Sequence, residues 1–150
     1  MLLSLIVWIG GLIFFPVVAQ AAFSVLPTRH LAGLMVGRSL GILHWMGIVS
    51  GAVFLISSLI YSRSSEGTPH GFAARNILIC IMLALTLFSQ LGIIPRMDTL
   101  RASMGSLDSV AADDPARLQF DALHLWSTRV EGGVLLLGLL VAYLTARSLT

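Results

Sequence analysis

The chain has 150 residues, of which 57% are hydrophobic and only 11% are charged. About a quarter of the residues in a soluble domain are charged, because its surface must face water. This chain therefore has too little charge to cover a soluble globule, and its mean hydropathy of +0.93 favours a bilayer as the solvent of its apolar surface. Its length predicts one domain, over residues 1–150.

The net charge of +2 comes from nine Arg and seven acidic residues, and the chain contains no Lys. The Arg residues are scattered between apolar runs, whereas binding to nucleic acid needs a clustered basic face. Nucleic acid is therefore not an expected partner, and the lipid bilayer is. The single cysteine, Cys80, excludes an internal disulfide.

The first two apolar runs each predict a membrane-spanning helix. The first ends before Pro27, which predicts a helix over about residues 2–26. The second predicts a helix over about residues 34–61. Its most apolar stretch, residues 41–61, is by itself long enough to cross about 30 Å of hydrocarbon.

The second half of the chain predicts two more helices. The third apolar run predicts a helix over about residues 74–95, followed by a loop over residues 96–114. Asp114 before Pro115 is typical of a helix start, because the carboxylate caps unpaired amides and Pro suits the first helical position. The last helix is therefore predicted over residues 115–147. Together the four helices predict an all-α fold, an antiparallel four-helix bundle integral to the membrane.

The N-terminal run has a second interpretation. Ala19-Gln20-Ala21 resembles a signal-peptidase site, and cleavage there would remove residues 1–21. However, no basic residue precedes the run, and the run continues past the site. A retained first helix is the expectation, and a true start upstream of Met1 is a further alternative.

The distribution of Arg near the helix ends predicts the orientation in the membrane. One side carries five Arg residues and the other carries three. The excess predicts that the connections 27–33 and 96–114 face the cytoplasm. The larger group is Arg29, Arg38, Arg96, Arg101 and Arg117, and the smaller group is Arg63, Arg75 and Arg147.

The second predicted helix carries small residues and a histidine on one face. These residues are Gly37, Gly41, His44, Gly47 and Gly51, at spacings of 4, 3, 3 and 4. Glycines allow membrane helices to approach closely, so this is a predicted helix-packing face. His44 should then face a neighbouring helix. It is either a packed, hydrogen-bonded side chain or a metal-ligating or proton-handling group.

The fourth predicted helix carries a polar stripe at spacings of 4, 3, 4 and 3. Its members are Arg117, Asp121, His124, Thr128 and Glu131. The outer part of the stripe suits an amphipathic segment entering the membrane from water. Glu131 lies deepest, and there it needs a neutralising partner such as Arg129 or Arg38.

The antiparallel arrangement brings polar residues of the second and fourth predicted helices and of the predicted loop 96–114 toward one membrane face. The candidate metal ligands are His44, His124, Asp98 and Glu131. The polar cluster around them is Arg38, Arg96, Arg101 and Asp121. Such a cavity could hold a cation or an anionic headgroup, although no known metal-binding or phosphate-binding motif occurs in the chain.

Several segments together resemble a known family. They are Trp8-Ile9-Gly10-Gly11, Phe14-Phe15, Ala32-Gly33, His44, residues 94–101, and residues 120–124 with Ser127. They are similar to the transmembrane protein 205-like domain, whose bacterial members form domain-of-unknown-function family 4149. The resemblance covers essentially the whole chain. It implies a four-helix integral membrane protein of the bacterial inner membrane, with no established reaction.

Three functions are compatible with these features. The first is binding or handling of a cation, metal or small solute by the polar cluster, with a metal ion as the possible cofactor. The second is a scaffold or accessory subunit that packs against other membrane helices or forms a homo-oligomer. The third is a redox protein with b-type haem between His44 and His124. No enzyme is predicted, because Ser127 and Thr128 lack the surroundings of a catalytic nucleophile.

Overall fold

The structure, a computed structural model, describes residues 1–66 and 73–147. These residues form helices without any strand, so the predicted all-α fold is confirmed. The elements are α1 (Leu2–Val25), α2 (Arg29–Glu66), α3 (Ala74–Phe88), the π-helical turn η1 (Ser89–Ile93), α4 (Ile94–Met104) and α5 (Pro115–Arg147).

Four helical segments are long and apolar enough to span a membrane. At most 39% of the most apolar window of any segment is buried inside the bundle. The remaining apolar surface needs a lipid environment, because water would not solvate it favourably. The chain is a multi-pass membrane protein. The segments are Leu2–Val25, Arg29–Ser64, Ala74–Met104 and Pro115–Arg147.

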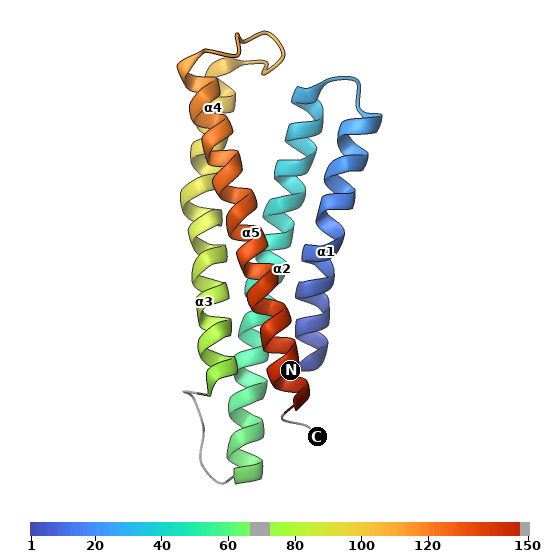
Figure 1. Cartoon of the computed structure of the whole chain (residues 1–150), viewed down its shortest axis with the longest axis vertical. Helices are drawn as coiled ribbons and strands as arrows, with labels where there is room; N and C mark the ends of the chain where they lie inside the picture. The colour runs from blue at the N-terminus through green and yellow to red at the C-terminus, as the bar shows by residue number, and fades with distance from the viewer. Residues whose placement is uncertain (67–72, 148–150) are drawn as a thin grey trace.

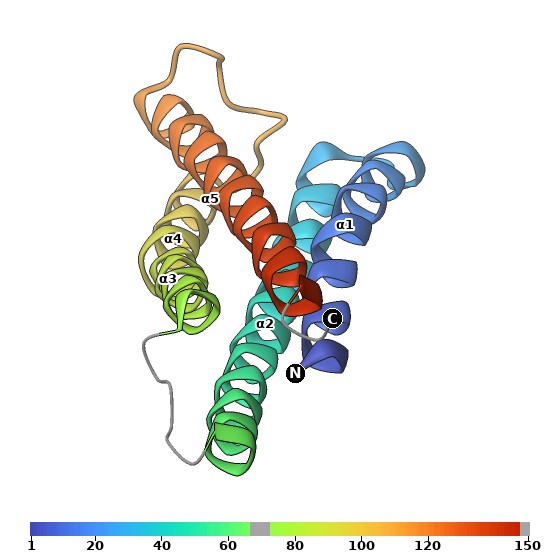
Figure 2. The ribbon, with the colours of Figure 1, turned by 60° about the horizontal axis from the view of Figure 1, so that its bottom comes forward.

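The four spans form two pairs that meet in one half of the molecule and separate in the other. Figure 1 shows successive spans running alternately up and down, with both termini near the lower end. In Figure 2, α5 crosses from the upper end of α4 toward the lower part of α1 and α2. The pair of α1 and α2 therefore contacts the pair of α3–α4 and α5 mainly below, and the upper ends stand apart.

The hydrophobic core lies where the spans meet. Trp8 of α1 is the largest fully buried side chain, at 1% exposure. Gly47 and Gly51 of α2 leave room for its indole ring, because a Cβ at Gly51 would lie 2.9 Å from that ring and a Cβ at Gly47 would overlap it. The other two glycines of the predicted packing face differ, since a Cβ added at Gly37 would lie 3.5 Å from an Arg101 nitrogen and a Cβ added at Gly41 would meet nothing within 4 Å.

All three predicted connections are shorter in the structure, since α2 also continues to Glu66, beyond its predicted end at residue 61. The predicted loop 96–114 is helical as far as Met104, and Gly105 ends α4 with a φ of +69°, a value that favours glycine. The helix predicted from residue 34 already begins at Arg29. The side-chain oxygen of Thr28 accepts a hydrogen bond from the Leu31 amide at 3.2 Å, which caps this earlier start.

The packing of Trp8 against α2 can be tested with a matched pair of glycine substitutions. Gly47→Ala should lower the free energy of unfolding by about 1–3 kcal/mol, because its methyl group overlaps the indole. Gly10→Ala is the control, because a Cβ there meets nothing within 4 Å. Unfolding of the purified protein in detergent, followed by circular dichroism, measures both. Equal stability of the two variants would contradict the packing described here.

Candidate functional site

His44 occupies the interior of the bundle at 1% exposure. Its two ring nitrogens contact side chains from two other spans. Nδ1 lies 2.8 Å from Oε1 of Gln90 in η1, and Nε2 lies 2.6 Å from Oε1 of Glu131 in α5. The glycine-bearing face of α2 therefore directs an imidazole between α3–α4 and α5, and the three side chains form one hydrogen-bonded chain.

The hydrogen bonds of His44 restrict its protonation state. Because Gln90 presents a carbonyl oxygen, Nδ1 of His44 donates a hydrogen bond to it. Nε2 and Glu131 then share one proton, which gives either an imidazolium with a carboxylate or a neutral imidazole with a carboxylic acid. Both states have zero net charge, which reduces the penalty of placing two ionisable groups at membrane depth.

The π-helical turn positions Gln90. Pro95 follows this turn, lacks an amide hydrogen, and its ring conflicts with the carbonyl of Leu91 in a regular α-helix. The turn accommodates the conflict, since the amide of Ile94 bonds to the carbonyl of Ser89, five residues earlier. The irregular turn thus lies directly beside the buried histidine.

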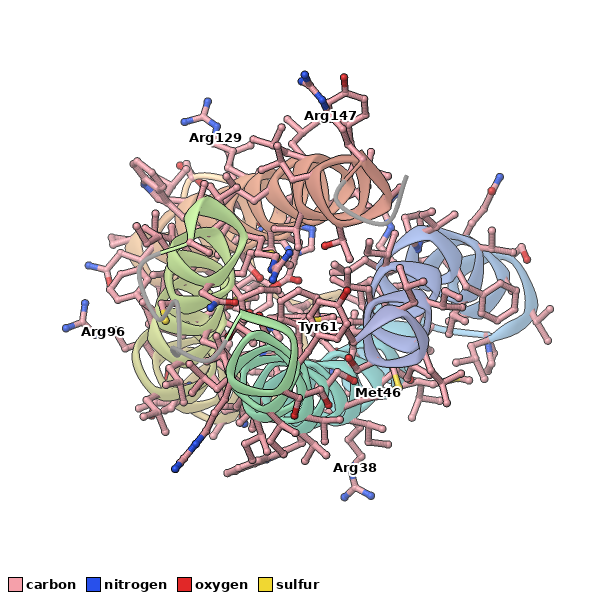
Figure 3. All side chains as sticks on the ribbon, turned by 90° about the horizontal axis from the view of Figure 1, so that it is seen from below. Arg38, Met46, Tyr61, Arg96, Arg129 and Arg147 are labelled. Atoms are coloured by element: carbon pink, nitrogen blue, oxygen red, sulfur yellow. The ribbon has the colours of Figure 1, made fainter. Side chains whose placement is uncertain are left out.

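The partner of Glu131 is His44, and neither Arg129 nor Arg38 takes that place. Figure 3 shows both Arg side chains pointing away from the bundle. Arg129 instead lies over the ring of Trp126, 5.6 Å from its centroid. The expectation that Glu131 needs a neutralising group at depth is met by the imidazole at 2.6 Å.

A cavity of about 800 Å³ lies between the upper parts of the two helix pairs. It extends from the level of Glu131 toward the connections α1–α2 and α4–α5. Its apolar lining includes Leu12, Phe15, Leu40, Leu43, Ile94 and Leu135, and its polar lining includes Asp98, Arg101, Asp121, His124, Thr128 and Glu131. One continuous space therefore joins apolar walls to ionisable side chains.

The connection between α4 and α5 reaches across to the other helix pair. Oδ2 of Asp108 accepts a hydrogen bond from the backbone amide of His30, in the first turn of α2, at 3.3 Å. A carboxylate is favoured there by the helix dipole and by the unpaired amides of the first turn. At the start of α5, Asp114 accepts a hydrogen bond from the Ala116 amide at 2.8 Å, as the Asp-Pro pattern predicts.

The structure gathers some of the predicted site residues and separates others. Asp98, Arg101, Asp121, His124 and Glu131 all line the cavity, and His44 lies directly behind Glu131. Figure 3 shows Arg96 pointing outward, like Arg38. The cavity therefore collects five of the eight predicted candidates, all from α4 and α5.

The candidate metal ligands do not converge on one point. In the described part of the chain, no three His, Cys, Asp or Glu side chains lie close enough together to hold a metal ion. His124 is seven residues before Glu131, which corresponds to about 10 Å along α5. Since His44 contacts Glu131, the two histidines lie at different levels of the bundle.

Gln90 was not identified by sequence reasoning. Its only sequence signal is that Ser89 and Gln90 interrupt an otherwise apolar run shortly before Pro95. Polar side chains within a membrane span are best placed against a neighbouring helix, so this interruption does carry information. The direction in which Gln90 points depends on the π-helical turn.

A sequence profile described as a domain of unknown function (DUF4149) matches residues 3–106. The chain belongs to the DUF4149 family. The match covers α1 to α4 and therefore includes His44, Gln90 and Arg101, whereas Glu131 lies in α5 outside the matched residues. No curated protein and no solved structure matches the chain. The likeness to transmembrane protein 205-like proteins stays a prediction.

The coupling between His44 and Glu131 can be measured with a double-mutant cycle. His44→Leu alone should lower the free energy of unfolding by about 3–5 kcal/mol, because it leaves a buried carboxyl group without its partner. The double variant His44→Leu, Glu131→Leu should recover part of that loss, since no ionisable group remains unpaired and only the neutral amide of Gln90 has lost its partner. Equilibrium unfolding in mixed micelles measures His44→Leu, Glu131→Leu, the double variant and the wild type.

The exposed His124 provides the control for this cycle. His124→Leu should change stability little, because the side chain is exposed. Additive losses from His44→Leu and Glu131→Leu would show that the two side chains act independently.

Proposed function

We propose that this DUF4149 protein binds a small amphipathic solute in the cavity between its two helix pairs. The observation that carries the proposal is the cavity itself, about 800 Å³ in volume and lined by both apolar and ionisable side chains. Small-molecule sites typically have volumes of about 300–1,000 Å³, with apolar walls and a few convergent polar groups. The cavity therefore suits a molecule with a hydrocarbon part and a polar group.

The pair of Glu131 and His44 marks the inner end of the proposed site. The Glu131 side chain is 14% exposed and lines the cavity, while His44 is buried behind it. An ionisable residue at membrane depth usually marks a binding or transport pathway. The proposed role of this pair is to hydrogen-bond a polar group of the solute through the Glu131 carboxyl group, while the pair keeps its shared proton and stays without net charge.

A solute is better supported than a metal ion or a haem. Both ring nitrogens of His44 are already hydrogen-bonded, so a metal ion would have to displace Gln90 or Glu131. An iron held by both histidines would need His124 at the level of His44, and it lies about 10 Å further along α5. The cation and haem functions therefore require rearrangements that a solute in the existing cavity does not.

A scaffold function has less support from the glycine face. Gly47 and Gly51 pack against Trp8 of the same chain, and Gly37 faces Arg101. These glycines are occupied within the bundle, which leaves Gly41 as the one member of the face with open space beside it. Packing with other membrane helices or with a second copy would have to use a different surface.

The Arg distribution supports an orientation of the protein in the membrane. We propose that the protein lies in the bacterial inner membrane, with the connections α1–α2 and α4–α5 on the cytoplasmic side. Arg29, Arg101 and Arg117 all line the upper part of the cavity. The excess of Arg at this end agrees with the tendency of basic residues to remain on the cytoplasmic side. The solute would then enter from that side or from the adjoining leaflet.

Two neighbouring glycines allow a sharp test of solute binding. Gly132 lines the cavity and Gly133 does not, and a Cβ at either position meets nothing within 4 Å. The probes are tritiated dodecanol, laurate and dodecylamine, added to the protein in phosphatidylcholine nanodiscs. Saturable binding of at least one probe is expected. Gly132→Leu should weaken it about 10-fold or more by filling the cavity, an effect of about 1.4 kcal/mol.

Gly133→Leu is the matched control and should leave the affinity unchanged. It makes the same substitution in the same helix turn without entering the cavity. Absence of saturable binding for all three probes, or equal weakening by both substitutions, would overturn the proposed function.

A further inference from the structure

Arg101 is a buried arginine whose hydrogen-bonding capacity is mostly unused. The residue is 8% exposed, and its Nη1 donates to Oδ1 of Asp98 at 3.1 Å. Its Nε is buried without an acceptor in the described part of the chain. A guanidinium carries five N–H donors, and the contact with Asp98 uses one of them. The ring of Phe120, 5.2 Å away, holds the group from one side without accepting those hydrogens.

The surroundings of Arg101 leave space for a ligand rather than for another side chain. Its nitrogens face Gly33 and Gly37 of α2, where an added Cβ would lie at 3.7 and 3.5 Å. A second hollow, of about 570 Å³, lies beside the first, and Arg101, Asp98, Gly37 and Ile94 line both. Arg101 therefore borders both hollows.

Asp98 does not satisfy this group. Its side chain is 61% exposed, and an ion pair of this kind contributes only about 0–1 kcal/mol. Buried donors to which no acceptor is bound are unfavourable, the more so for a charged group. The edge formed by Nε and Nη2 has the geometry that matches two oxygens of a carboxylate or phosphate. An oxyanion would thus supply the hydrogen-bond acceptors that Arg101 lacks.

The acidic side chains of the cavity are mostly engaged elsewhere. Glu131 is paired with His44, and Asp108 accepts from the first turn of α2. Asp98 already contacts Arg101, which leaves Asp121 as the acidic group of the cavity lining that makes no hydrogen bond or ion pair within the described residues. Arg29 and Arg117 line the same end of the cavity and add positive charge to it. The upper cavity can therefore accept an anion although its formal charges are mixed.

We infer that Arg101 binds the oxyanion of the ligand, a carboxylate or phosphate, while the hydrocarbon part of that ligand lies between the apolar walls of the cavity. This inference rests on the proposed function and adds the chemical class of the ligand's polar group. Arg101 acts as a specificity-determining residue. The two open sides of the guanidinium allow the headgroup to approach from either hollow.

The test compares probes with one tail and different headgroups in phosphatidylcholine nanodiscs. The affinity of the protein for laurate and dodecyl phosphate should be higher than for dodecanol or dodecylamine by about 10-fold or more, as expected for a charge-assisted bidentate contact. Arg101→Met should lower their affinity to that of dodecanol. Binding of dodecanol should weaken far less than binding of laurate, and an unchanged circular dichroism spectrum should show that the variant is folded.

Two further variants separate the guanidinium from general charge effects. Arg96→Met removes a positive charge from the same helix at an exposed, outward-pointing position and should change nothing. Arg101→Lys keeps the charge but loses the planar fork, so it should restore only part of the preference for oxyanions.

Two further anions show whether the oxyanion belongs to an amphiphile or is a free anion. Inorganic phosphate and acetate, measured alone, should bind far more weakly than the amphiphiles. If they bind through Arg101 as tightly as laurate does, the oxyanion site is supported and its ligand is a free anion. Equal affinities of laurate and dodecanol for the wild type, or a preference for laurate that survives Arg101→Met, would overturn this inference and leave the proposed function standing.

Discussion

The contact between His44 and Glu131 determines how the spans are held together around the candidate site. Oε1 of Glu131 and Nε2 of His44 lie 2.6 Å apart and share one proton, in surroundings where either charge alone would be strongly disfavoured. The contact joins α2 to α5, and the second nitrogen of the same ring joins α2 to η1 through Gln90. Three of the four spans are thus fixed at one level. Below this level Trp8 and the apolar core close the bundle, and above it the helix pairs diverge.

The divergence places the two polar features of the cavity at different depths. Glu131 lies at the inner end, next to the buried imidazole, and Arg101 lies nearer the connections. Between them the walls are mainly leucine and phenylalanine side chains. A molecule that fills the space therefore meets the pair of Glu131 and His44 at one end and Arg101, among side chains of both charges, at the other. This polarity along a single axis orients an amphipathic ligand in a way that an apolar crevice could not.

The spans and the general position of the site could be predicted from the sequence, because hydropathy and helical spacing depend on local patterns. The glycine spacing correctly indicated that His44 faces the interior. Spacing could not show that Arg101 points inward while Arg96 points outward, since both follow Pro95 and their direction depends on the π-helical turn. It also could not pair His44 with Glu131, because their contact joins helices whose relative height the sequence does not specify.

The π-helical turn also has a consequence for the angular phase of the third span. A π-helical turn adds one residue to the regular hydrogen-bond pattern of an α-helix, and each residue turns the helix by about 100°. The side chains of α4 are therefore rotated by about 100° relative to those of an uninterrupted continuation of α3, and α4 presents a different face to α2. The π-helical turn directs Gln90 toward the imidazole, and it also determines the direction in which Asp98 and Arg101 project from α4. The position of both polar ends of the cavity therefore depends on the same backbone irregularity.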